Sequence, residues 1–154
     1  MTGRSTDPPE SVVRRTLAVD ADVARLANVR AAIRDVARAC EAPATCMDDL
    51  VQAVDEAVTN IIVHGYRGLP GTIEVTAELV GDDIVITIED RAPTFDPTTV
   101  PAPDLTIAPD RRRPGGMGVH LMRLAMDTIR HRPRPGGGNI LILTRSRVAR
   151  PKEG

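Results

Sequence analysis

Aromatic residues and lysine are scarce in this 154-residue chain, which has no tryptophan, one tyrosine (Tyr66) and one phenylalanine (Phe95). Bases of single-stranded nucleic acid stack on aromatic side chains, so the composition disfavours that class of binder. Lys152 is the only lysine. A phosphate-binding loop of the GxxxxGK[ST] type is therefore excluded, and any phosphate that this chain binds must be held in another way.

Cysteine and long apolar runs are also lacking. Cys40 and Cys46 have no neighbouring cysteine or histidine at the spacing of a zinc site, so we expect buried free thiols. No run approaches the roughly 18 apolar residues of a membrane span, and the polar first residues with Pro8 and Pro9 do not resemble a signal peptide. The formal net charge of -1 gives no general attraction to nucleic acid or to anionic lipid. We expect a cytoplasmic protein with no membrane segment and no direct nucleic-acid contact.

Chain length limits the domain organisation. With 154 residues and 42% hydrophobic residues, the chain suits one well-buried domain and is too short for two ordinary ones. We expect this single domain over residues 12–147, after a disordered N-terminal tail at 1–11 and before a C-terminal tail at 148–154.

Hydrophobic periodicity predicts the order of secondary-structure elements. Helical spacing predicts a helix at 23–40, capped by Asp20 or Asp22, and a second that is capped by Thr45 or Asp48 and ends near Gly65. A third helix of about three turns follows the glycines near residue 116. Alternating or β-branched runs predict strands at 12–19, 72–79, 84–90, 128–132 and 139–146. The expected fold class is α+β, a two-layer sandwich with about three helices on one face of a mainly antiparallel mixed sheet.

Polar residues interrupt the second predicted helix. Glu56 and Asn60 are four residues apart, so both project from one side of the helix. Taken alone, the pair has the pattern of a solvated polar stripe. The apolar residues around it, such as Val58 and Ile61, place it instead at the border of the core, where unpaired polar groups are costly. The Asn60 carbonyl oxygen suits an octahedral magnesium shell completed by phosphate and water.

Glycines and arginines form two further candidate features. The glycine turn at 115–118 is either a phosphate-binding turn or an ordinary start of a helix. The proline-rich stretch at 91–114 has no periodicity, which is typical of a long loop. It ends in Arg111, Arg112 and Arg113, which suit a lid over phosphate groups, a solvated loop or a nucleic-acid contact. We favour the lid.

These motifs together resemble those of a known family. The run Glu56-Ala57-Val58-Thr59-Asn60 precedes His64-Gly65-Tyr66, Asp90 ends a strand, and Gly116-Met117-Gly118 opens a helix. In this order and spacing, over about residues 17–144, the chain resembles the bacterial anti-sigma factor serine/threonine kinases. These are GHKL ATPases, whose Bergerat fold is shared with histidine kinase catalytic domains.

The resemblance implies roles for individual residues. Glu56 is the expected catalytic residue, which orients or deprotonates the attacking hydroxyl, and Asn60 is the expected Mg²⁺ ligand. Asp90 is expected to accept a hydrogen bond from the adenine amino group. The loop at 91–114 is the expected ATP lid. The remaining residues expected to bind the nucleotide are Ala92, Gly115, Gly116, Met117, Gly118, Val119, His120 and Leu121.

Position 92 departs from the family pattern, which usually has glycine two residues after the adenine-binding aspartate. Ala92 is small enough for close approach to a base, but unlike glycine it does not adopt a positive φ without strain. This substitution supports the alternative that the chain is a catalytically inactive module of the same fold that regulates by binding partners only.

The activity implied by the resemblance is ATP- and Mg²⁺-dependent phosphorylation of a STAS-type anti-anti-sigma protein, together with sequestration of a sigma factor. Such a protein would exchange partners according to phosphorylation and nucleotide state. The resemblance also makes a homodimer plausible.

Overall fold

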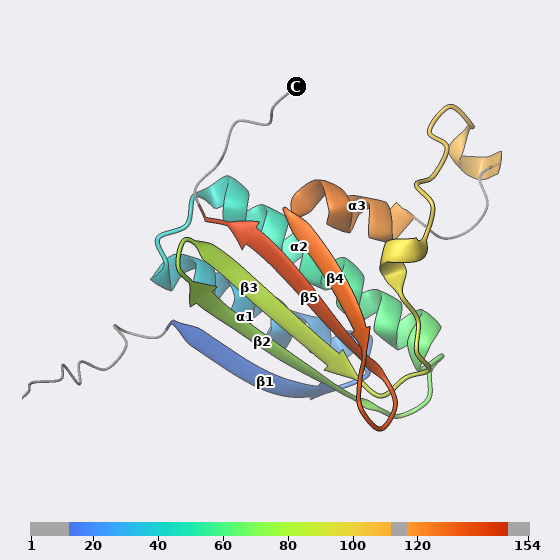
Figure 1. The fold of residues 1–154 in the computed structure, drawn as a ribbon, viewed down its shortest axis with the longest axis horizontal. Helices are drawn as coiled ribbons and strands as arrows, with labels where there is room; N and C mark the ends of the chain where they lie inside the picture. The colour runs from blue at the N-terminus through green and yellow to red at the C-terminus, as the bar shows by residue number, and fades with distance from the viewer. Residues whose placement is uncertain (1–12, 112–116, 148–154) are drawn as a thin grey trace, which may run out of the picture.

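The computed structural model describes residues 13–111 and 117–147, and three helices and a five-stranded sheet form its two layers. The helices α1 (Leu26–Ala39), α2 (Ala44–Asn60) and α3 (Met117–Ala125) lie on one face of the sheet (Figure 1). The strands are β1 (Arg14–Asp20), β2 (Thr72–Val80), β3 (Asp83–Asp90), β4 (Thr128–Pro133) and β5 (Asn139–Ser146). The predicted α+β sandwich is confirmed.

Sheet order is β1-β2-β3-β5-β4, and each neighbouring pair is antiparallel. The prediction of a mixed sheet was wrong in this respect, since the described strands contain no parallel pair. Strand β5 lies between β3 and β4, so the second strand of the C-terminal hairpin pairs with β3 and the first strand, β4, forms the edge of the sheet. This insertion brings the start of β5 beside the end of β3, with Asn139 opposite Asp90.

The core lies between the sheet and the helices. Ile84, Ile86 and Ile88 of β3 are buried, as their alternation in the sequence predicts. They belong to the same core cluster as Leu50 of α2. Cys40 and Cys46 are free and buried, which confirms the expected thiols. Burial on this scale is the main stabilising contribution to the fold.

Helix boundaries differ from the predictions in two places. Asp22 caps the short 3₁₀ turn Val23–Arg25 ahead of α1 by accepting a hydrogen bond from the Ala24 amide, as expected. The cap of α2 is Pro43, which has no side-chain cap hydrogen bond, so the prediction of Thr45 or Asp48 as its cap was wrong. The α-helical winding ends at Asn60, and residues Ile61–Gly65 continue as a π-helical turn.

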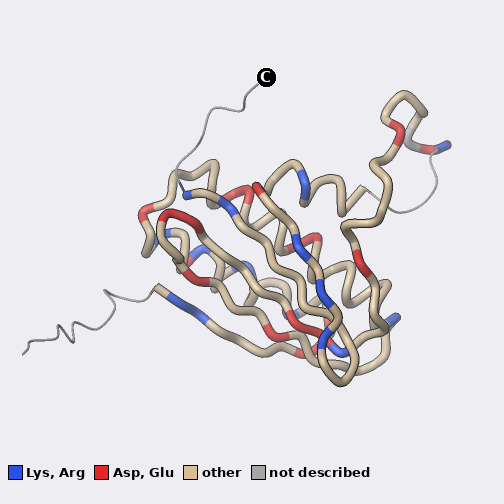
Figure 2. Tube along the Cα trace, in the orientation of Figure 1, with Lys and Arg blue, Asp and Glu red and all other residues tan. Residues whose placement is uncertain are grey.

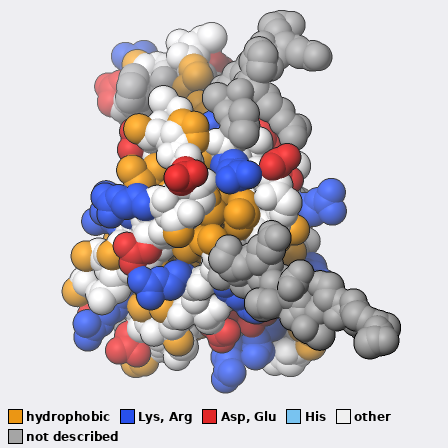
Figure 3. All heavy atoms as spheres, turned by 90° about the vertical axis from the view of Figure 1, so that its left-hand side faces the viewer, with side chains coloured by type: hydrophobic (Ala, Val, Ile, Leu, Met, Phe, Trp, Pro, Cys, Tyr) orange, Lys and Arg blue, Asp and Glu red, His pale blue; other side chains and the backbone are white. Residues whose placement is uncertain are grey.

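Figure 1 shows that three elements have an end on the same side of the molecule. These are the C-terminal ends of α2 and β3 and the N-terminal end of α3, on the side away from the β2–β3 hairpin. Acidic and basic residues are both found along the described chain in the sheet and in the helical layer (Figure 2). At the end that carries the β2–β3 hairpin, charged side chains of both signs surround apolar ones (Figure 3). The predicted tails, 1–11 and 148–154, lie outside the described residues.

Candidate functional site

Glu56 and Asn60 face the N-terminal turn of α3. A Cβ atom placed on Gly118 would lie 2.8 Å from Glu56 Oε2 and 3.6 Å from Asn60 Oδ1. The absence of a side chain at Gly118 therefore leaves the space that the Glu56 carboxylate occupies. Both side chains are half-buried, and neither makes a hydrogen bond or an ion pair with another described residue. The predicted polar pair and Gly118, the last glycine of the predicted turn, are thus brought together.

The π-helical turn after Asn60 leads to Tyr66, which ties the helix to the sheet. The Tyr66 amide donates to the Ile61 carbonyl at 2.8 Å. Its hydroxyl donates to the Thr72 carbonyl at 2.7 Å and accepts from the Arg91 amide at 2.8 Å. Gly71 makes room for this ring, because a Cβ there would overlap it. The only tyrosine therefore fixes the end of the Asn60 helix relative to the residue that follows Asp90.

Asp90 ends β3 as a buried carboxylate with 3% of its surface exposed. Its Oδ1 accepts two hydrogen bonds of 2.9 Å, one from the Ala92 amide and one from Asn139 Nδ2. In the described part of the chain no donor reaches Oδ2. Burial raises the pKa of this carboxyl, against the hydrogen bonds from Asn139 and Ala92 and the nearby His131, which lower it. Asp90 thus has one engaged oxygen and one available acceptor.

Ala92 needs no unusual backbone conformation. Positive φ values among the described non-glycine residues occur at Glu41 and Arg67 and not at Ala92. The Ala92 side chain is buried, and a Cβ placed on Gly65 would lie 3.0 Å from the Ala92 Cβ. Gly65 therefore leaves the space that the Ala92 methyl group requires, and the departure from the family pattern fits this fold.

The other residues predicted to bind nucleotide lie on α3 or ahead of it. Val119 is buried in the core, while His120 and Leu121 are half-buried. Met117 is 36% exposed at the first position of the helix. Gly115, Gly116, Arg112 and Arg113 lie outside the described residues. Arg111 is exposed in the short 3₁₀ turn Pro109–Arg111, far along the predicted lid.

Arg123 joins α3 to the predicted lid. Its Nη2 donates to the carbonyls of Thr98 at 2.8 Å and Pro97 at 3.4 Å. These carbonyls belong to the 3₁₀ turn Pro97–Thr99, which Asp96 caps through the Thr98 amide. The first turn of the predicted lid is therefore fixed to the same helix that carries Gly118. Sequence reasoning assigned no role to Arg123, because a lone arginine on a helix gives no signal of its partner.

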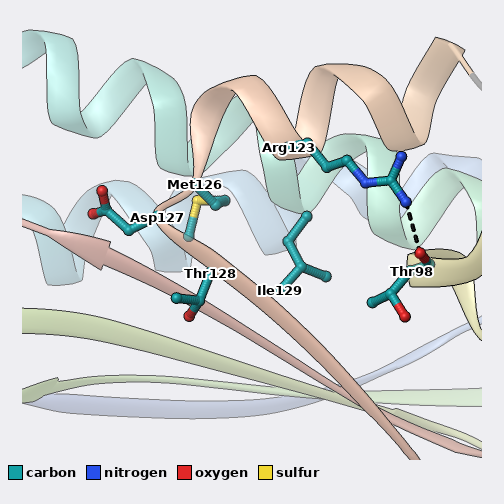
Figure 4. A pocket seen from close by; sticks show the side chains of 6 residues that line it. All are labelled: Thr98, Arg123, Met126, Asp127, Thr128 and Ile129. Carbon is teal, nitrogen blue, oxygen red and sulfur yellow. Dashed lines mark hydrogen bonds between the residues drawn. The ribbon is translucent and has the colours of Figure 1, made fainter. Parts of the chain in front are cut away.

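A hollow of about 270 Å³ lies beside this contact. Figure 4 shows its lining by Thr98, Arg123, Met126, Asp127, Thr128 and Ile129. Its charged groups already have partners: Arg123 donates to the Thr98 carbonyl, and Asp127 accepts from the Ser146 amide at 2.6 Å. The hollow contains none of Glu56, Asn60, Asp90 or Gly118, so we assign no ligand to it.

The chemistry of a metal at this site is limited by its donors. Residues 13–111 and 117–147 contain no group of three or more His, Cys, Asp or Glu side chains placed to hold a metal ion. The Asn60 amide lies beside the Gly118 backbone and has no partner among the described residues, so it fits a magnesium ion whose other ligands are phosphate and water. Within the described ranges no helix is long and apolar enough to cross a membrane.

The sequence matches a known protein family over the segment that contains this site. The family described as the histidine kinase-like ATPase domain matches residues 19–145, which include Glu56, Asn60, Asp90 and Gly118. The chain belongs to this family. The resemblance stated from the sequence motifs is confirmed.

Curated relatives and a solved structure agree with this assignment. The serine/threonine-protein kinase BtrW of Bordetella bronchiseptica is 31% identical over 98 residues, which cover 63% of this chain and 69% of that protein. The anti-sigma F factor of Clostridium acetobutylicum is 33% identical over 98 residues, 63% of this chain and 68% of the relative. The structure of the RsbU and RsbW domains of Rv1364c from Mycobacterium tuberculosis matches with a TM-score of 0.62 at 23% identity. That match covers 86% of this chain and 31% of the longer one, and it supports the fold.

Proposed function

We propose that this chain is a cytoplasmic serine/threonine-protein kinase and anti-sigma factor, which uses ATP and Mg²⁺ to phosphorylate a STAS-type anti-anti-sigma protein. The observation that carries the proposal is the position of Gly118 against Glu56 and Asn60, with both polar side chains unengaged by the described residues. The names of the relatives, which include a serine/threonine-protein kinase and anti-sigma factors, support the same activity.

Nucleotide binding would use the two sides of the site. The free Oδ2 of Asp90 is suited to accept a hydrogen bond from the adenine amino group, while Ala92 packs beside it. The backbone at residues 115–118 and the N-terminus of α3 would face the phosphates, since amide groups at a helix start attract anions. Backbone donors and a segment rich in arginine would thereby replace the phosphate-binding lysine that the chain lacks.

Phosphoryl transfer would take place beside Glu56. The serine or threonine oxygen of the partner bonds to the γ-phosphorus, the bond from that phosphorus to the bridging oxygen breaks, and ADP leaves. Glu56 accepts the hydroxyl proton. Asn60 would hold Mg²⁺, which neutralises charge on the phosphate oxygens when bound. Residues 91–114 would act as the ATP lid, with its first turn held by Arg123.

Regulation would follow from which partner is bound. We propose that one surface holds a sigma factor, that phosphorylation and nucleotide state decide between the sigma factor and the anti-anti-sigma protein, and that the chain acts as a homodimer. The second candidate function is a module that binds these partners without phosphoryl transfer. Its support was Ala92, and the contact of Ala92 with Gly65 weakens that support.

The experiment is a phosphoryl-transfer assay with labelled ATP, magnesium and candidate STAS-domain proteins. We expect the wild type to label its partner and Glu56→Gln to lower the rate by about 10²- to 10⁴-fold, the usual contribution of a general base. Glu74→Gln is the matched control, because Glu74 is exposed on β2 away from the site. A wild type that binds the partner tightly but transfers no label would refute the kinase and leave the binding module.

A further inference from the structure

Asn139 holds the Asp90 carboxylate from the neighbouring strand. It is the first residue of β5, pairs with Asp90 across the sheet and is 8% exposed. Its Nδ2 lies 2.9 Å from Asp90 Oδ1 and 3.2 Å from the Pro93 carbonyl oxygen. A buried amide with this many partners in one direction has a restricted orientation.

The Phe95 amide determines which end of the Asn139 side chain points toward Asp90. This backbone N–H can only donate, and it donates to Asn139 Oδ1 at 2.8 Å. The nitrogen of Asn139 therefore faces Asp90. His131 Nε2 lies 2.7 Å from the same oxygen, on the Phe95 side of the amide. The His131 side chain is 4% exposed, which shields this arrangement from water.

Gly138 brings the two strands close enough for this contact. Its φ is +114°, and a Cβ there would overlap the Asp90 carbonyl oxygen and lie 2.8 Å from Arg91 Cα. The missing side chain at Gly138 therefore allows the backbone at the start of β5 to contact the backbone at the end of β3. Asn139 is the first side chain after this close approach.

We propose that Asn139 is a positioning residue for nucleotide binding, which occupies Asp90 Oδ1 and so leaves Oδ2 as the single acceptor offered to the base. The inference rests on the proposed function of Asp90. In this role Asn139, Phe95 and His131 do not contact the nucleotide themselves and affect its binding only by positioning Asp90. Since Phe95 lies near the start of the predicted lid at 91–114, the same amide also fixes the lid where it leaves the sheet.

Replacing the amide by a carboxylate changes the charge with almost no change of shape. In Asn139→Asp, an oxygen would replace Nδ2 at 2.9 Å from Asp90 Oδ1, and two carboxylates at this distance require a shared proton. The described titratable groups that face this position are Asp90 from β3, Asp96 from the following loop and His131 from β4. The ion pair of Glu89 with Arg134 lies one residue away.

The test measures ATP affinity as the ratio of the variant Kd to the wild-type Kd between about pH 5.5 and 8.5. At the lowest pH we expect the Kd of Asn139→Asp for ATP to lie within about threefold of the wild-type Kd. At the highest pH its Kd should be about tenfold or more above the wild-type Kd, because the shared proton is lost. Asn139→Ala should bind about tenfold or more weakly at every pH. Asn28→Asp and Asn28→Ala are the matched controls, since Asn28 is exposed on α1.

A purely structural role for Asn139 would lower thermal stability without a pH-dependent affinity ratio. Folded Asn139 variants with wild-type ATP affinity at every pH would overturn the inference. If Asp90→Asn also binds ATP normally, the proposed function of Asp90 is wrong. If Asp90→Asn abolishes binding while both Asn139 variants bind normally, only the role of Asn139 is wrong.

Discussion

Gly118 of α3 lies so close to Glu56 of α2 that a Cβ atom on the glycine would come within 2.8 Å of Glu56 Oε2. This contact joins two segments that are far apart in the sequence. It also explains why glycine is required at this position even though α3 is a regular helix. The carboxylate occupies the place that a side chain would take.

Gly118→Ala should displace the Glu56 carboxylate while leaving the fold intact, because the atom that it meets is the free end of a flexible side chain. We expect the free energy of unfolding to change by less than about 1 kcal/mol, since alanine also favours the helix. Phosphoryl transfer should fall by about tenfold or more, because small misplacements of a catalytic group are costly. The rate of label transfer to the partner measures the effect on catalysis, and urea unfolding measures the effect on stability. A rate equal to wild type would contradict this role of Gly118.

Gly138→Ala should be far more disruptive than Gly137→Ala. Both glycines have positive φ, +114° and +110°, so both substitutions carry backbone strain of about 1–3 kcal/mol. Only Gly138 also faces the backbone of Asp90 and Arg91, whereas nothing lies within 4 Å of a Cβ on Gly137. Overpacking should add about 1–3 kcal/mol at Gly138. Urea unfolding of the two variants gives the difference between their free energies of unfolding. Equal destabilisation would show that β3 and β5 can move apart at position 138 without loss of stability.

Asp90→Asn should weaken nucleotide binding without loss of stability at neutral pH. Asparagine keeps an oxygen for the Ala92 and Asn139 donors but places an NH₂ group where Oδ2 stood. ATP affinity should therefore fall by about 10- to 100-fold, because two donors then face each other. Isothermal titration of each protein with ATP measures this loss. Wild-type affinity would show that the adenine contact lies elsewhere.

The pH dependence of stability should differ between wild type and Asp90→Asn. Burial raises the pKa of Asp90 in the folded state. Its contribution to stability is therefore fully present below the ordinary carboxyl pKa and is lost as the pH rises through the raised value. The amide of the variant does not titrate, so the stability of the variant relative to wild type should increase across this window and then level off. Urea unfolding followed by Tyr66 fluorescence at several pH values checks the sign; a relative stability that falls with pH would contradict it.

Gly65 and Ala92 should be energetically coupled. A Cβ at position 65 would lie 3.0 Å from the Ala92 Cβ, so we expect Gly65→Ala to cost about 1–3 kcal/mol in the wild type and less when Ala92→Gly is also present. Helix propensity at position 65 cancels in this double-mutant cycle. Ala92→Gly alone should leave ATP affinity within about threefold of wild type, because Ala92 has no positive φ to relieve. Additive free energies would show that the two residues do not constrain each other.

Much of the fold was predictable because the local patterns agree with the tertiary structure. The alternation of Ile84, Ile86 and Ile88 predicted a strand with one buried face, and all three are buried. The spacing of Glu56 and Asn60 predicted one side of a helix, and both face Gly118. Local patterns could not predict the π-helical turn at Ile61–Gly65, since α- and π-helical winding accept the same residues and tertiary contacts select between them.

Residues whose function depends on a distant partner escaped prediction. Asn139 follows a run of glycines at the start of a strand, where a polar residue is ordinary, and its partners Asp90 and Phe95 lie more than forty positions away. Arg123 likewise gave no sign of its contact with Thr98. For Asn139, its place directly after the glycines at 136–138 was the only available signal, and that signal named no partner.

The sequence by itself determined the elements, the polar pair on the second helix, the aspartate that ends a strand and the family, because periodicity and motif spacing are properties of neighbouring residues. Tertiary structure alone decided that β5 lies between β3 and β4 in the sheet. That insertion places Asn139 against Asp90, just as the packing of α3 on α2 places Gly118 against Glu56. The physical reason is that a buried carboxylate or amide is held in one orientation by the donors and acceptors around it, and these come from strands and helices far apart in the chain.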